Sequence, residues 1–174
     1  MATEPFTLSA SLGVDAIKRQ KPFALQQQPF FADKNRAFWI LQTAGWAGYF
    51  LLRALSGMAN AMGFTFILHT ALLTATGYSI TLLMAAAYRR LITLRPIITW
   101  VFTIVIVLIA SASFSAIETW SHATFLRAGT RPEGFEFLGA ILLDFSLLAA
   151  WTALYYGINY FLLLEEQTDQ MLRL

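Results

Sequence analysis

The stretch 96–117, PIITWVFTIVIVLIASASFSAI, contains no charged residue. A transmembrane helix needs about 20 predominantly apolar residues to cross roughly 30 Å of hydrocarbon, at a helical rise of about 1.5 Å per residue. Pro96 suits the first turn of such a helix, because the N–H that proline lacks would have no partner there. The stretch therefore predicts a helix that crosses a membrane.

Three further stretches are long and apolar enough to do the same. They cover residues 36–55, 64–88 and 137–164. The first of them is interrupted by Gln42 and Arg53. Across the chain 57% of residues are hydrophobic and 13% are charged, whereas an average soluble domain has about 25% charged residues. We therefore expect an all-α fold, an integral membrane four-helix bundle over residues 35–164.

Residues 1–34 have a different composition, with several prolines, a run of glutamines and scattered charges. No apolar run precedes a small-residue cleavage site, so the stretch does not have the pattern of a signal peptide. We expect a mobile cytoplasmic tail. An amphipathic helix near residues 9–19 is the alternative.

The basic residues indicate which way the spans face. One side of the predicted bundle carries Lys18, Arg19, Lys21, Lys34, Arg36, Arg89, Arg90, Arg95 and Arg173. The other side carries only Arg53, Arg127 and Arg131. Because cytoplasmic flanks of membrane spans hold an excess of Lys and Arg, we expect both termini in the cytoplasm and the loop 118–136 outside.

The last apolar stretch has no stop signal. Residues 165–174, EEQTDQMLRL, contain no Gly or Pro and are mostly good helix formers. The helix is therefore predicted to extend into the cytoplasm as the start of a connector. Spacings of four and three residues predict a heptad seam for a homodimer, formed by Ala153, Gly157, Tyr160, Leu164, Gln167, Met171 and Leu174.

The opposite face of this helix, with Leu162, Glu166 and Asp169, is predicted to face lipid or water. Small seam residues would let two helices approach closely inside the bilayer, and the larger apolar ones would meet outside it. The alternative is a frayed amphipathic end that lies on the membrane surface.

Two aromatic-rich stretches carry a resemblance to a known family. They are FWILQTAGWAGYFLLR at 38–53 and WTALYYGINYFLLLEEQ at 151–167. The residues that match are Phe38, Trp39, Leu41, Gln42, Gly45, Trp46 and Tyr49 in the first, and Trp151, Leu154, Tyr155, Tyr156, Gly157 and Tyr160 in the second. Together they resemble the membrane part of LytS-like sensor histidine kinases.

This resemblance implies a membrane-embedded input domain of a two-component system in a bacterial inner membrane. The last transmembrane helix would relay a stimulus to a kinase core that uses ATP and Mg²⁺ and phosphorylates a response regulator. No phosphoacceptor stretch like Pro-His-Phe-Leu-Phe-Asn and no Asn- and Gly-rich ATP-binding boxes occur in these 174 residues. We therefore expect no cofactor and no catalysis in this chain, although the full-length protein would be a phosphotransferase.

The residues also exclude several function classes. No GxGxxG, GxxxxGK[ST] or HExxH motif is present, the chain has no cysteine, and its net charge of +2 is too small to suggest a nucleic-acid binder. The informative residues are ionisable ones at membrane depth, where each costs several kcal/mol unless it is paired or hydrated. Those predicted to converge in the outer half of the bundle are Arg53, His69, Glu118 and Asp144, with His122 from the exterior loop.

Three interpretations of this convergence stay open. Arg53 and Asp144 could form a structural ion pair between the first and last spans. Arg53 could instead receive an anionic ligand between apolar walls of Tyr49, Phe114 and Trp120. A metal site of His69, His122, Glu118 and Asp144, or haem between the two histidines, is the third.

The favoured function is the signalling input domain. The alternative from another class is a small permease-like or accessory membrane subunit, in which Arg53 and Asp144 line a path for an ion or solute. A purely structural anchor is the third possibility. The stimulus is not readable from the residues.

Overall fold

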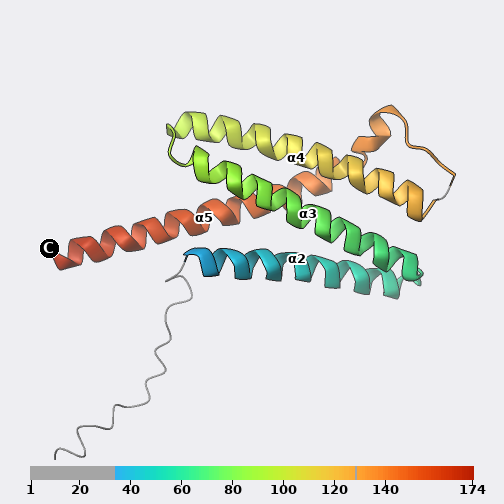
Figure 1. Ribbon diagram of the computed structural model, residues 1–174, viewed down its shortest axis with the longest axis horizontal. Helices are drawn as coiled ribbons and strands as arrows, with labels where there is room; N and C mark the ends of the chain where they lie inside the picture. The colour runs from blue at the N-terminus through green and yellow to red at the C-terminus, as the bar shows by residue number, and fades with distance from the viewer. Residues whose placement is uncertain (1–33, 128) are drawn as a thin grey trace, which may run out of the picture. The chain divides into compact units, whose positions relative to one another are not determined.

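The computed structural model describes residues 34–127 and 129–174 (Figure 1). These residues form four long helices and one short 3-10 helix: α2 (Lys34–Ala59), α3 (Phe64–Leu91), α4 (Pro96–Phe125), η1 (Gly134–Leu138) and α5 (Ile141–Arg173). The described part contains no strand, so the predicted all-α class is confirmed there. The predicted tail lies outside the described residues, except for Lys34.

Three helical segments are long and apolar enough to cross a membrane. They are Phe64–Leu91, Pro96–Phe125 and Gly134–Arg173. The chain therefore has the features of a multi-pass membrane protein. Helix α2 has 26 residues and would be long enough, but it is less apolar, and its crossing of the membrane stays a prediction.

Each turn of the chain reverses its direction, so consecutive helices are antiparallel neighbours (Figure 1). Helix α3 packs between α2 and α4, and α5 packs mainly on α4, with few close approaches to α2. This arrangement brings basic residues to one end of the bundle, at the start of α2, the end of α3 and the start of α4. The last turns of α5 run beyond that same end (Figure 1), and every residue from 163 to 174 is exposed.

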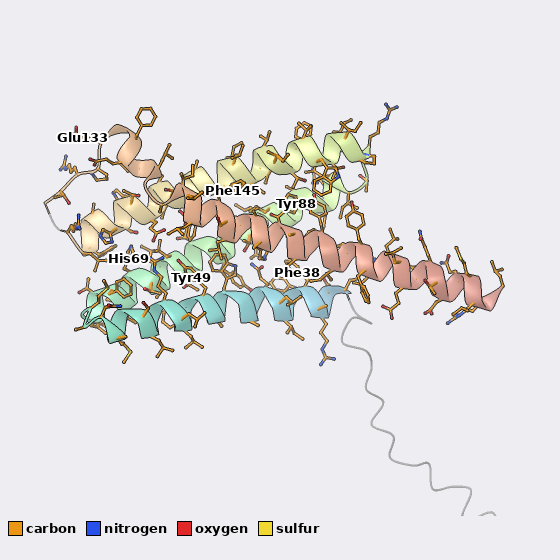
Figure 2. The ribbon with its side chains drawn as sticks, turned by 180° about the vertical axis from the view of Figure 1, so that it is seen from behind. Phe38, Tyr49, His69, Tyr88, Glu133 and Phe145 are labelled. Atoms are coloured by element: carbon orange, nitrogen blue, oxygen red, sulfur yellow. The ribbon has the colours of Figure 1, made fainter. Side chains whose placement is uncertain are left out.

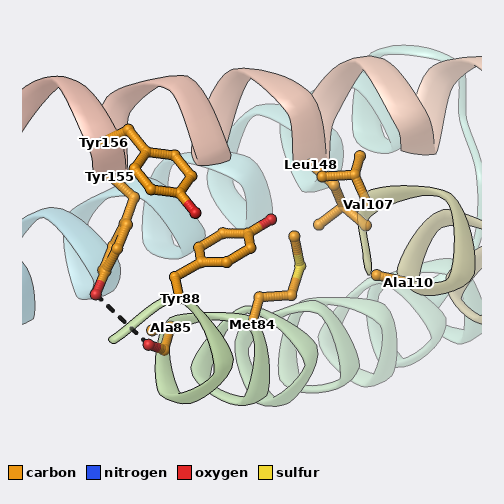
Figure 3. Packing of buried hydrophobic residues seen from close by; sticks show 8 residues of the cluster. All are labelled: Met84, Ala85, Tyr88, Val107, Ala110, Leu148, Tyr155 and Tyr156. Atoms are coloured by element: carbon orange, nitrogen blue, oxygen red, sulfur yellow. Dashed lines mark hydrogen bonds between the residues drawn. The ribbon is translucent and has the colours of Figure 1, made fainter. Parts of the chain in front are cut away.

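The main core lies where α3, α4 and α5 meet (Figure 3). The tilted rings of Tyr88 and Tyr156 pack there with centroids 5.0 Å apart. The Tyr88 hydroxyl lies 3.0 Å from Thr152 Oγ1, and the Tyr156 hydroxyl lies 2.8 Å from Thr103 Oγ1. Because no water in hydrocarbon could satisfy these hydroxyls, the paired threonines are what allows tyrosine to be buried there.

A second cluster joins α2, α3 and α4 through Trp46, Leu73 and Phe114. The six-membered ring of the Trp46 indole lies against α3 at Gly77, where an added Cβ would collide with it. Only glycine leaves room for this close approach of side chain to backbone. Gly77 therefore sets how near α2 lies to α3.

Several helix boundaries differ from those predicted by the apolar stretches, most of all the end of α4. Helix α4 continues from residue 117 to Phe125, so Glu118 and His122 lie on a helix and the connection from α4 to α5 is shorter than predicted. The segment 118–125 has no Gly or Pro to end the helix. Before α5, Gly134 takes a positive φ of 56°, and the chain forms η1 before α5 begins at Ile141.

Candidate functional site

Arg53 is the centre of a charged cluster at the end of the bundle opposite the basic one. Its Nη2 donates to Glu118 Oε1 on α4 in an ion pair, and its Nη1 donates to the Tyr49 hydroxyl at 2.9 Å. The guanidinium also lies 5.8 Å from the ring centroid of Tyr49 and 6.0 Å from that of Phe66, within the range of cation–π attraction. Arg53 thereby links α2, α3 and α4.

Asp144, in the first turn of α5, is 4% exposed, and its Oδ2 has no hydrogen-bond partner. It interacts electrostatically with both Glu118 and Arg53. Asp144 therefore belongs to the cluster without pairing directly with the guanidinium. A buried polar group without a hydrogen-bond partner is costly, so Asp144 is an incompletely satisfied group of the cluster.

The predicted ion pair of Arg53 with Asp144 is wrong, because the ion-pair partner of Arg53 in the structure is Glu118. The physical reason is the longer α4, which carries Glu118 inward as part of a helix rather than leaving it in a wet loop. Helix α5 in turn approaches α2 closely at few positions.

Two histidines border the cluster. His69 on α3 is 1% exposed, and its Nε2 lies 2.9 Å from Ser121 Oγ. Ser121 Oγ also donates to the Glu118 carbonyl at 3.0 Å. His69 Nδ1 is buried and has no hydrogen-bond partner. The ring of His122 contacts that of His69 edge to face, with centroids 5.8 Å apart.

The structure brings together most of the predicted site residues. Tyr49 and His69 lie toward the same end of the bundle (Figure 2), in one network with Arg53, Glu118, His122 and Asp144. Two expected pocket walls do not join it. Trp120 is 53% exposed and Phe114 is fully buried against Trp46.

The metal interpretation finds no support in the described residues, where no group of three His, Asp or Glu side chains could hold a metal ion. The two imidazoles contact each other directly instead of facing each other across an opening for haem. Whether the cluster binds a ligand stays a prediction.

Sequence reasoning missed a second polar network, centred on Gln42. This side chain is 1% exposed, and its Nε2 donates to Thr81 Oγ1 at 2.7 Å and to the Tyr78 carbonyl at 3.2 Å. Its Oε1 accepts from Trp151 Nε1 at 2.9 Å, and Trp46 Nε1 donates to Thr81 Oγ1 at 3.0 Å. The signal was present, because an amide inside a predicted span requires a partner.

The predicted seam of α5 is uncovered in the single chain. Its exposed members are Ala153, Gly157, Tyr160, Leu164, Gln167, Met171 and Leu174. A Cβ added to Gly157 would meet no atom within 4 Å. The prediction for Leu162 is wrong, because it is 7% exposed and faces the space between α2 and α5. Glu166 and Asp169 are exposed as expected.

Comparison of the chain with protein-family models, curated proteins and solved structures finds no match. The resemblance to LytS-like kinases therefore rests on its two stretches. In the structure these stretches contact each other, through the Gln42–Trp151 hydrogen bond and through the rings of Phe38 and Tyr155, whose centroids are 6.0 Å apart.

Proposed function

We propose that the chain is the membrane-embedded input domain of a sensor histidine kinase, and that α5 relays a change at the charged cluster to a cytoplasmic output. One observation carries this proposal. The same 33-residue helix holds Asp144 in its first turn and exposed apolar residues in its last turns. At a rise of about 1.5 Å per residue the helix is about 50 Å long, enough to connect one membrane face with the other.

The cluster is suited to act on α5 because its charges are shared between helices. Glu118 pairs with the guanidinium of Arg53, and Asp144 interacts electrostatically with both side chains. A proton, cation or anionic ligand that alters this balance changes the attraction of α5 to α2 and α4. Such a stimulus can shift the helix only if it binds two arrangements with different affinity, and the two arrangements would be two registers of the seam.

The proposal includes four membrane spans with both termini in the cytoplasm of a bacterial cell, a homodimer along the seam, and a kinase core that uses ATP and Mg²⁺ to phosphorylate a response regulator. The collection of basic residues at one end of the bundle supports the orientation. The two resembling stretches, in contact through Gln42 and Trp151, support the family.

A permease-like or accessory subunit is the second candidate. Two buried groups favour it, Asp144 Oδ2 and His69 Nδ1, which have no hydrogen-bond partner and could pass a proton or bind a cation. In that case the cluster would serve transport, and α5 would not need to move.

Disulfide crosslinking separates the two candidates. The chain has no cysteine, so single cysteines can be placed at Gly157, Leu164 and Met171, with Glu166 as the comparison position. In native membranes we expect more disulfide dimer at the three seam positions than at Glu166. We also expect Asp144→Asn to change the yield at Met171.

The matched control is Glu133→Gln, an exposed carboxyl outside the cluster whose amide can still accept the backbone hydrogen bond that it makes. It should leave every yield unchanged. Equal yields at all four positions, or no response to Asp144→Asn, would contradict the relay. If Asp144→Asn abolished an ion flux measured in proteoliposomes and left the crosslinking yields unchanged, the transport alternative would be established.

A further inference from the structure

A cavity of about 500 Å³ lies between α2 and α5. The two helices approach each other closely at few positions, and Phe38 lies where they run side by side (Figure 2). The lining follows α2 from Lys34 to Tyr49 and α5 from Leu147 to Leu162. We call this space the α2–α5 groove.

The interior of the groove suits hydrocarbon. Its walls are mainly aromatic and aliphatic, and Gly45 leaves open space where a Cβ would meet nothing within 4 Å. The polar groups in its floor are already engaged, since Gln42 is hydrogen-bonded at both ends of its amide and the Trp151 N–H is donated to it. A polar ligand head would therefore gain little inside.

One end of the groove is basic. Lys34 and Arg89 line it there, and both are exposed. No acidic residue occurs in the described lining. Basic pockets between membrane helices favour anionic lipid headgroups, and a guanidinium matches the geometry of a phosphate.

The length of the groove agrees with one membrane leaflet. From Lys34 to Tyr49 the helix rises about 22 Å at about 1.5 Å per residue. Half of a bilayer that is about 40–45 Å thick with its headgroups measures about 20–22 Å. A lipid with its phosphate at Lys34 would place the end of its chain near Tyr49.

We propose that the α2–α5 groove binds one anionic phospholipid, with an acyl chain between the helices and the headgroup phosphate on Lys34 and Arg89. At 3.6 residues per turn, the groove residues Trp151 and Tyr155 lie about 120° and 160° around α5 from Gly157, whereas Ala150 and Leu154, which also line the groove, lie within about 60° of it. The groove therefore adjoins the seam along part of α5. The inference does not depend on the proposed signalling role.

Native mass spectrometry of the full chain, released from detergent micelles, tests the site. The probes are phosphatidylglycerol and phosphatidylcholine with identical acyl chains. We expect one retained phosphatidylglycerol, bound about 30-fold more tightly than phosphatidylcholine if two basic residues each contribute as they do near membrane surfaces.

Two pairs of variants locate the lipid. Gly45→Leu fills the groove and should weaken phosphatidylglycerol binding about tenfold or more, whereas Gly48→Leu, at another open glycine of α2 outside the lining, should not. Lys34→Gln with Arg89→Gln should remove the headgroup preference. Arg90→Gln with Arg95→Gln, at the same end but outside the groove, should keep it.

Equal affinity for both lipids would overturn the proposal, and so would equal losses in the two glycine variants. A change of oligomeric state in Gly45→Leu without loss of lipid would show that the groove is an interface between copies. If Gly45→Leu fails to fold, the two pairs of basic variants decide, and equal retention of phosphatidylglycerol by both pairs would refute the site.

Discussion

Replacing Arg53 with methionine should destabilise the protein more than replacing Arg53 and Glu118 together. Without the guanidinium, the carboxyl group of Glu118 loses its ion-pair partner while Asp144 still interacts with it electrostatically. The side chains of the Arg53–Glu118 pair are 28% and 14% exposed, so the pair is neither fully buried nor fully solvated.

Two limits bracket the size of the effect. Removing one partner of a fully buried pair costs about 3–5 kcal/mol, and an exposed pair contributes about 0–1 kcal/mol. For this intermediate burial we expect Arg53→Met to cost about 2 kcal/mol, which for a chain of this size lowers the melting temperature by about 4–8 °C. Glu118→Gln should cost less, about 1 kcal/mol, because Asp144 remains to face Arg53.

Thermal unfolding in lipid nanodiscs measures the cycle, with Arg131→Met, at an exposed position, as the control that should leave the melting temperature unchanged. The double variant should cost about 1 kcal/mol, which is less than Arg53→Met alone and about 2 kcal/mol less than the sum of the single changes. Strict additivity would show that the two side chains are not coupled. Equal damage from the Arg131 control would show that the effect reflects net charge alone.

Three further outcomes follow from the structure. Gly77→Ala should lower the melting temperature, because the added Cβ collides with the indole packed on it and overpacking costs about 1–3 kcal/mol; an unchanged value would contradict the packing. Gln42→Leu should cost about 1–3 kcal/mol by leaving the Trp151 N–H without an acceptor, checked by the same assay. Cysteines at Thr93 and Thr130 should react with an impermeant reagent from opposite sides of the membrane, and labelling of both from the same side would disprove the crossing of α4 on which the topology depends.

The charged cluster shows which features of a site can be predicted from residue patterns and which cannot. Antiparallel neighbours place residues by their depth along the bundle, so Arg53, His69 and Glu118 could be assigned to one end from the order of apolar stretches. The partner of Arg53 could not, since it depends on the rotation of each helix about its axis. A helix that continues only a few residues past its apolar run was enough to bring Glu118, rather than Asp144, to the guanidinium.

The surroundings of Gln42 and Leu162 also could not be predicted from residue patterns. Gln42 interrupts an apolar stretch, and only the approach of α3 and α5 reveals Thr81 and Trp151 as its partners. Leu162 fits the outer face of a heptad pattern, yet it is buried and lines the α2–α5 groove. Periodicity describes a helix by itself and carries no information on which of its faces a neighbour covers.

The residues alone determined that this protein is helical and suited to a membrane, because apolar length and the need to satisfy every backbone N–H and C=O within a segment are local properties. They also determined the charge asymmetry of its two ends. Only the tertiary structure decided the Arg53–Glu118 pair, the Gln42 network and the α2–α5 groove. These depend on helix rotation and spacing, which follow from the packing of side chains far apart in the chain, such as Trp46 against Gly77.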